Sequence, residues 1–106
     1  MRERKITSEV LIMAEHKEVP LINIGGVYIL PKEEILGVFD LDTASTKTDT
    51  KRFLSAHEKA GRMVTVGFDI PKSFVVTAKG RREKVYITTL SSTSIESRWK
   101  RQSKHL

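Results

Sequence analysis

The sequence predicts an α+β domain: a small, mostly antiparallel sheet of five or six strands, one central helix near residues 48–60 and a short C-terminal helix. Short apolar runs that alternate with polar residues, each bounded by Gly, Pro or charged turns, indicate the strands. Residues 48–60 instead carry helix start and stop signals and are followed by Gly61. The 106 residues of the chain suit one domain with a modest core.

The first strands follow residues 1–20, a charge-balanced segment that we assign as an N-terminal extension. Residues 21–24 and 27–30 predict two short strands that are joined at a glycine bend and ended by Pro31. Residues 35–41 are so strongly apolar that we expect a strand buried on both faces. One small sheet and two short helices leave part of such a strand uncovered, so we expect other subunits to cover it.

The middle of the chain predicts a helix and then three strands. The helix is expected to have a cap at Thr46 or Thr48. The side chains predicted to lie on or beside its apolar face are Phe53, Leu54, Ala56 and Ala60. Residues 63–68 alternate and predict a strand with one buried face, and residues 73–78 and 84–90 predict a β-hairpin around a charged turn.

The C-terminal helix is expected to open at a capping box, because Thr93 and Glu96 have the required spacing. Ile95 and Trp99 stand four residues apart and therefore share one face of this helix. We expect the Trp99 ring to pack with Ile95 onto the sheet, and stacking on a nucleic-acid base is the alternative.

The residue types do not suggest an enzyme. His16, His57 and His105 are not at ligand spacing and the chain has no Cys, so we predict no metal site and no cofactor. Asp40 and Asp42 would share one face of a strand, and we interpret them as a strand end that turns into solvent rather than as an acid–base pair. We therefore expect no catalytic residues and no small-molecule substrate.

The apolar run at residues 10–14 is too short for a signal peptide or a membrane span. A chain without Cys also suits a reducing compartment. We therefore expect a cytoplasmic protein that does not contact membranes.

Positive charge is concentrated in the last 35 residues, which hold nine Lys and Arg but only two Asp and Glu, while the whole chain has a net charge of +6. Such a localised excess is typical of proteins that bind polyanions. Arg side chains fork onto phosphate oxygens, and Lys side chains add charge. The alternative is a solvated hairpin turn that discourages edge pairing. The predicted nucleic-acid-binding residues are Lys72, Lys79, Arg81, Arg82, Lys84, Arg98, Lys100 and Arg101.

Four segments together resemble the Rem family of bacterial extracellular-matrix regulators, and most closely its RemB branch: LINIG at 21–25, ILGVFDLD at 35–42, PKSFVVT at 71–77 and TTLSSTSIESR at 88–98. The resemblance covers residues 21–98 and leaves residues 99–106 as a basic tail. It implies a transcriptional regulator of biofilm-matrix genes. It also implies rings of identical subunits that bind DNA by electrostatic contacts around the ring.

One departure from the family bears on the DNA contacts. In the RemA branch, DNA binding depends on an arginine before the strand that matches residues 35–41 and on an arginine pair before the strand that matches residues 73–78. Glu34, Asp69 and Ile70 stand at those positions here. This branch therefore either binds DNA weakly or uses another surface, for which we favour Arg81, Arg82 and Lys84.

From the charge pattern and the resemblance together, we expect a homo-oligomeric ring that regulates transcription. It is expected to bind double-stranded DNA through phosphate and shape contacts. The alternative is a ring-forming protein-interaction scaffold that barely touches DNA. RNA binding is a third, more distant hypothesis.

Overall fold

The computed structural model describes residues 20–44 and 47–104 and confirms an α+β fold. The elements in chain order are β1 (Leu21–Gly25), β2 (Tyr28–Pro31), the 3-10 turn η1 (Lys32–Glu34), β3 (Ile35–Asp40), α2 (Leu41–Ala44), α3 (Thr48–Lys59), β4 (Met63–Val66), β5 (Ser73–Lys79), β6 (Arg82–Thr88) and α4 (Ser92–Lys104). The N-terminal extension lies outside the described residues, apart from Pro20.

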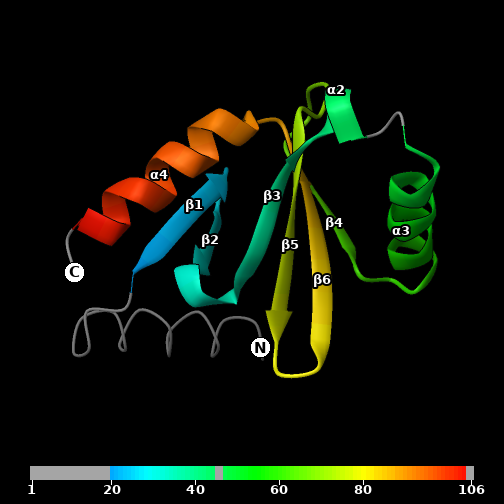
Figure 1. Ribbon diagram of the computed structural model, residues 1–106, viewed down its shortest axis with the longest axis horizontal. Coiled ribbons are helices and arrows are strands. Elements are labelled where there is room, and N and C mark those ends of the chain that lie inside the picture. The colour runs from blue at the N-terminus through cyan, green and yellow to red at the C-terminus, as the bar shows by residue number, and fades with distance from the viewer. Residues whose placement is uncertain (1–19, 45–46, 105–106) are drawn as a thin grey trace.

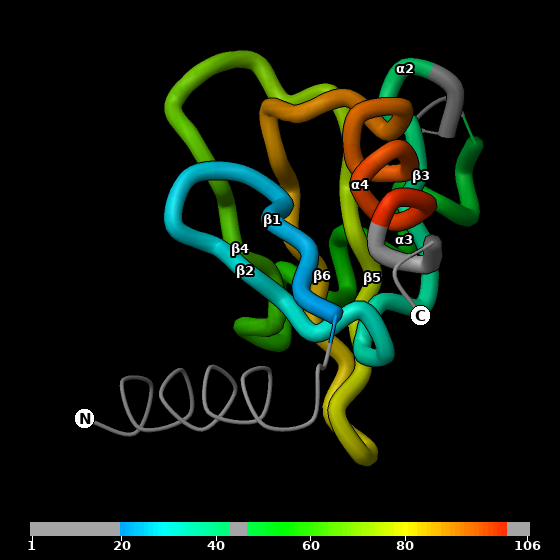
Figure 2. The backbone as a smooth tube through the Cα atoms, turned by 90° about the vertical axis from the view of Figure 1, so that its left-hand side faces the viewer, coloured from blue at the N-terminus to red at the C-terminus, as the bar shows by residue number. Residues whose placement is uncertain are grey.

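The six strands form two sheets, where the sequence predicted one. The larger sheet has the order β3-β5-β6-β4 and is antiparallel except for the parallel pair β4–β6, while β1 pairs with β2 alone. Figure 2 shows the β1–β2 hairpin crossing in front of the larger sheet rather than extending its edge. The prediction of a single sheet was wrong because the apolar side chains of this hairpin cover a face of the larger sheet.

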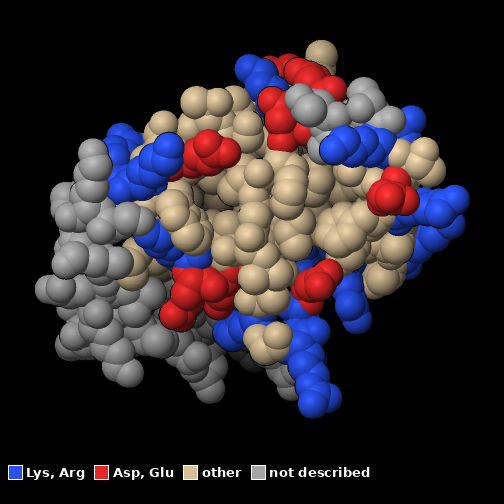
Figure 3. All heavy atoms as spheres, viewed as in Figure 1, with Lys and Arg blue, Asp and Glu red and all other residues tan. Residues whose placement is uncertain are grey.

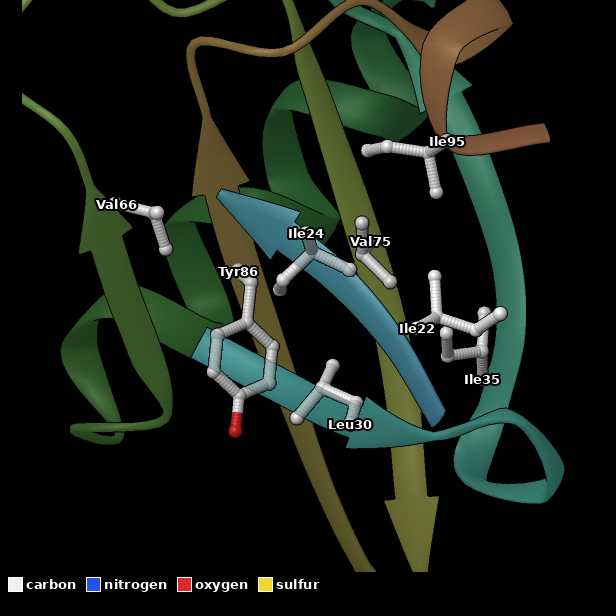
Figure 4. Packing of buried hydrophobic residues seen from close by; sticks show 8 residues of the cluster. All are labelled: Ile22, Ile24, Leu30, Ile35, Val66, Val75, Tyr86 and Ile95. Carbon is white, nitrogen blue, oxygen red and sulfur yellow. The ribbon is translucent and has the colours of Figure 1, made fainter. Parts of the chain in front are cut away.

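The main core lies between the larger sheet and a layer made by β1, β2 and α4, as Figures 1 and 2 show. Ile24, Val75 and Ile95 are completely buried there. Truncating an isoleucine of such a core to alanine costs about 2–5 kcal/mol. The buried side chains of the cluster, shown in Figure 4, are Ile22, Ile24, Leu30, Ile35, Val66, Val75, Tyr86 and Ile95.

Helix α3 covers part of the opposite face of the sheet. Phe53 and Leu54 pack there against Phe74, Val76 and Val85. The range predicted for this helix is confirmed to within one residue.

Two details predicted for α3 are wrong. Ala56 and Ala60 are exposed, because His57, one turn after Phe53, occupies the inner side of the helix. The N-cap position is Lys47, which makes no side-chain capping bond, so Thr48 is already inside the helix. Thr46 lies outside the described residues.

Strand β3 is not buried on both faces, which corrects the expectation for residues 35–41. It forms an edge of the larger sheet, and the side chains of Leu36 and Phe39 are 63% and 44% exposed. Helix α3 does not reach far enough across the sheet to cover them. The single chain therefore leaves an apolar surface along β3.

Strand β4 ends at Val66, so the prediction of a strand to residue 68 was too long. Phe68 lies in the following loop and is fully exposed, rather than on a buried face. This loop returns the chain to β5 at Ser73.

The C-terminal helix is the longest helix described, with 13 residues, and is not short. Its cap is Ser91, whose Oγ accepts a hydrogen bond from the Ser94 backbone N–H at 3.1 Å, so the predicted box of Thr93 and Glu96 is wrong. The helix continues without a break from residue 98 to residue 99, where the resemblance ends. No helix in the described part of the chain is long and apolar enough to cross a membrane.

Candidate nucleic-acid interface

The hairpin of β5 and β6 carries the largest group of predicted site residues. Its strands pair in antiparallel register from Ser73 opposite Thr88 to Lys79 opposite Arg82, and it projects from the bottom of the sheet in Figure 1. Only Gly80 and Arg81 connect the strands. Gly80 has φ +62°, a conformation that glycine adopts at little cost, and it allows this tight turn. The hairpin predicted from the sequence is confirmed.

The basic and acidic side chains of the hairpin lie on opposite faces. Side chains alternate along a strand, so Arg82 and Lys84 lie on the same face of β6 as Tyr86. Lys79 is directly opposite Arg82 and therefore shares that face. Lys79, Arg81, Arg82 and Lys84 are exposed, and we call these four residues the basic tip.

Glu83 is the only acidic residue of the hairpin, and it lies on the other face. Its Oε1 is 2.9 Å from Nε2 of His57 on α3. The Nδ1 atom of His57 is 2.8 Å from the backbone oxygen of Phe53. Both partners are acceptors, and the tautomer of the imidazole ring decides which of the two contacts its N–H group donates to. The carboxylate is thereby held away from the basic tip.

The four cations of the basic tip form no ion pair with any described carboxylate. Lys79 and Arg82 even form a like-charged cross-strand pair, an arrangement that destabilises a hairpin. Figure 3 shows Lys and Arg side chains projecting at the bottom of the molecule, where Figure 1 places this hairpin. The tip thus presents positive charge to solvent, which the charge of Glu34 offsets in part at Lys79.

Glu34, on η1, interacts electrostatically with Lys79 of the basic tip. Burial raises the pKa of its carboxyl above the usual value of 4.5, while Lys79 acts in the opposite direction and Glu33 adds to the rise. Burial also raises the pKa of Tyr86, and the charge of Glu34 adds to it. Glu34 therefore lies in an environment that disfavours the charged form of its carboxyl.

The structure does not bring the remaining predicted residues to the tip. Lys72 is exposed but precedes β5, and Lys79 ends that strand about 23 Å away at 3.3 Å per residue. Lys100 and Arg101 are exposed on α4, which lies with β1 and β2 in the layer that covers the larger sheet, away from the turn of the β5–β6 hairpin in Figure 1. Four of the eight predicted residues therefore form one group, and four do not join it.

Arg98 is bonded within the fold. Its Nη1 donates to the backbone oxygen of Asn23 at 2.8 Å and to Asn23 Oδ1 at 3.2 Å, which ties α4 to β1. The Trp99 ring packs against the main core, as expected, and Lys32 Nζ lies 4.6 Å from its centroid. That ring is therefore occupied by contacts inside the chain.

Sequence reasoning missed the contact between His57 and Glu83. The alternation along β6 already separates Glu83 from Arg82 and Lys84, but its partner lies 26 residues away and no local signal points to it.

Among the described residues, no group of three His, Cys, Asp or Glu side chains is placed to hold a metal ion. No protein-family model matches the chain, and no curated protein is significantly similar to it in sequence.

Proposed function

We propose that this chain is a cytoplasmic DNA-binding transcriptional regulator, of the matrix-gene type that its resemblance implies, and that it acts as a homo-oligomer. In this proposal the basic tips of several copies contact the phosphates of one duplex. A ring of identical subunits is the assembly that the resemblance implies.

The observation that carries the proposal is the sorting of charge on the β5–β6 hairpin. Lys79 and Arg82 repel each other across the strands, and neither forms an ion pair with a described carboxylate, although the charge of Lys79 interacts with Glu34. Such an arrangement costs stability, and a polyanion that binds the tip offsets that cost. The tip offers guanidinium groups and amines, which donate hydrogen bonds to phosphate oxygens, and in this proposal contacts to phosphate dominate and sequence preference is modest.

Several copies are needed because one tip makes few contacts. Four phosphate contacts bind weakly at physiological salt, whereas linked tips on one duplex act at a high effective concentration. The exposed apolar side chains Leu36 and Phe39 on edge strand β3 supply a surface through which copies can associate.

The test is a titration of duplex DNA at ionic strengths from roughly 50 to 200 mM. If all four cations of the tip contact phosphates, the logarithm of affinity falls with the logarithm of salt with a slope of about −3.6 for each engaged copy. Affinity then drops about 100-fold per copy over that range. A flat response, or no binding at the lowest salt, contradicts the proposal.

The alternative function is a protein-interaction scaffold. It is favoured by one observation: apolar Ile70, which is 80% exposed, stands where the RemA branch has an arginine. The same titration separates the two functions, because a scaffold does not bind the duplex.

A further inference from the structure

The loop between β4 and β5, residues 67–72, exposes more apolar surface than a solvated turn requires. Phe68 is fully exposed, and Ile70 is 80% exposed. Gly67, with φ +91°, holds the base of the loop so close to Thr89 that an added Cβ would lie 2.9 Å from its Cγ2 atom. The base of the loop is therefore packed, while its apolar side chains face solvent.

A hollow of about 340 Å³ lies between β3 and α3, on the face of the larger sheet that α3 covers. A side chain at Gly37 would collide with the Phe39 ring at 2.8 Å, and that ring in turn stacks on Phe74 at 5.0 Å. The Phe39 ring is thereby placed at the wall of the hollow, and most of the lining is apolar. Its lining residues are Leu36, Gly37, Phe39, Asp49, Thr50, Phe53 and Val76.

Phe68 cannot fill the hollow of its own chain. It follows the end of β4 by two residues, and the hollow lies beside β3, at the opposite edge of the larger sheet. The loop then crosses to Lys72, whose backbone oxygen accepts a hydrogen bond from the Leu41 backbone N–H at 3.0 Å. Three strand spacings of about 4.8 Å separate these edges. Figure 2 shows the β4–β5 loop arching at the upper left while β3 lies at the right.

We propose that the 67–72 loop of one chain inserts Phe68 into the β3–α3 hollow of a second copy. This inference deepens the proposed function, because it names the contact that brings several basic tips together. The volume of the hollow is at the low end of the range for ligand sites, about 300–1,000 Å³, and suits an aromatic side chain with a neighbouring aliphatic one. Figure 3 shows a broad uncharged area over β3, with Lys, Arg, Asp and Glu around it.

The charges on the two surfaces can pair. The loop carries Asp69 and Lys72, and both are exposed. The residues that line the hollow include one charged side chain, the exposed Asp49. Lys72 and Asp49 can therefore form a pair of opposite charge at the rim, which favours the correct docking orientation more than it adds affinity. In this arrangement Lys72 serves the contact between copies rather than DNA.

The contact is heterologous, because a loop meets a hollow and not another loop. Such contacts repeat from copy to copy and close into a ring or continue as a chain, according to the angle between neighbours. A chain that lacks only its loop can therefore still receive a neighbour, and a chain that lacks only its hollow can still dock.

The test measures mass by light scattering without DNA, which keeps it independent of nucleic-acid binding. The wild-type protein is expected to form a homo-oligomer. Phe68→Ser and Leu36→Lys are each expected to reduce the mass to the single chain of 12.0 kDa. An equimolar mixture of the two variants is expected to form a complex of two chains and nothing larger, because one intact loop meets one intact hollow.

The matched controls are Val27→Ser and Ile29→Lys, which change apolar side chains that are 88% and 49% exposed on the β1–β2 hairpin. Both should keep the wild-type mass. A monomeric wild-type protein, a Phe68→Ser variant of wild-type mass, or a mixture that stays monomeric would overturn the inference. Weak DNA binding by a protein that passes this test would instead count against the proposed function.

Discussion

The Nε2 atom of His57 lies 2.9 Å from Oε1 of Glu83, and this contact fixes helix α3 to the hairpin that carries the basic tip. It gives Glu83 a partner away from the neighbouring cations. The His57 side chain is 13% exposed, so the contact is shielded on one side from competing water. The helix that covers the sheet thus also determines how the tip presents its charge.

Replacing His57 tests whether its contact with Glu83 stabilises the fold. His57→Ala removes the contacts of the ring with Glu83 and with the backbone oxygen of Phe53, and should destabilise the fold by about 1–3 kcal/mol. Urea unfolding measures the change. Glu58→Ala, an exposed neighbour, should shift the midpoint little, and equal midpoints for the two variants would argue against the contact.

Arg98 should contribute to stability rather than to DNA binding. Arg98→Ala leaves Asn23 without its bonds from α4 and should cost about 1.5–3 kcal/mol of unfolding free energy, the range for hydrogen bonds to charged groups. Its salt slope for DNA should match that of the wild type. Arg101→Ala, from the same helix but exposed, is the control and should leave stability unchanged. A reduced salt slope with unchanged stability for Arg98→Ala would reverse this assignment.

Glu34 should make the fold less stable as pH rises. The pKa of Glu34 is raised in the folded state, so the folded chain binds this proton more tightly than the unfolded chain does. Stability is therefore fully present below the unfolded value of 4.5 and declines as pH rises through the folded value.

The variant Glu34→Gln removes this decline. Thermal midpoints of the two proteins should converge at about pH 4 and separate by about pH 8, where the variant is more stable. All other titrating groups are shared, so the difference isolates Glu34. A gap that is constant across this range would show that the carboxyl is not responsible.

Local patterns predicted the strands and helices well, because alternation and turn residues determine them within a few positions. The β5–β6 hairpin follows from two alternating runs around Gly80. The residue that caps α4 was harder to predict from the sequence. All four candidates, Ser91, Ser92, Thr93 and Ser94, have hydroxyl groups suited to capping. Only the position at which the chain leaves the sheet selects Ser91.

Long-range contacts could not be predicted from the sequence. Helical spacing indicated that Phe53 lies on the face of α3 that packs against the sheet. It did not show which neighbouring residues share that face, so Ala56 was wrongly predicted to be buried there. Arg98 resembles any other cation of the C-terminal third until its partner Asn23, 75 residues away, is known. The exposure of Leu36 and Phe39 likewise depends on how much of the sheet α3 covers.

The most direct test of DNA binding by the basic tip is the salt dependence of duplex binding. The double variant Arg81→Ala/Arg82→Ala is compared with the double variant Lys47→Ala/Lys51→Ala. Both double variants lose two exposed cations, the second pair from the start of α3. The account predicts that the tip variant loses affinity for all sequences alike and that the magnitude of its slope falls by about 1.8 per engaged copy, while the α3 variant keeps the wild-type slope. Equal slopes for the two variants would contradict the account.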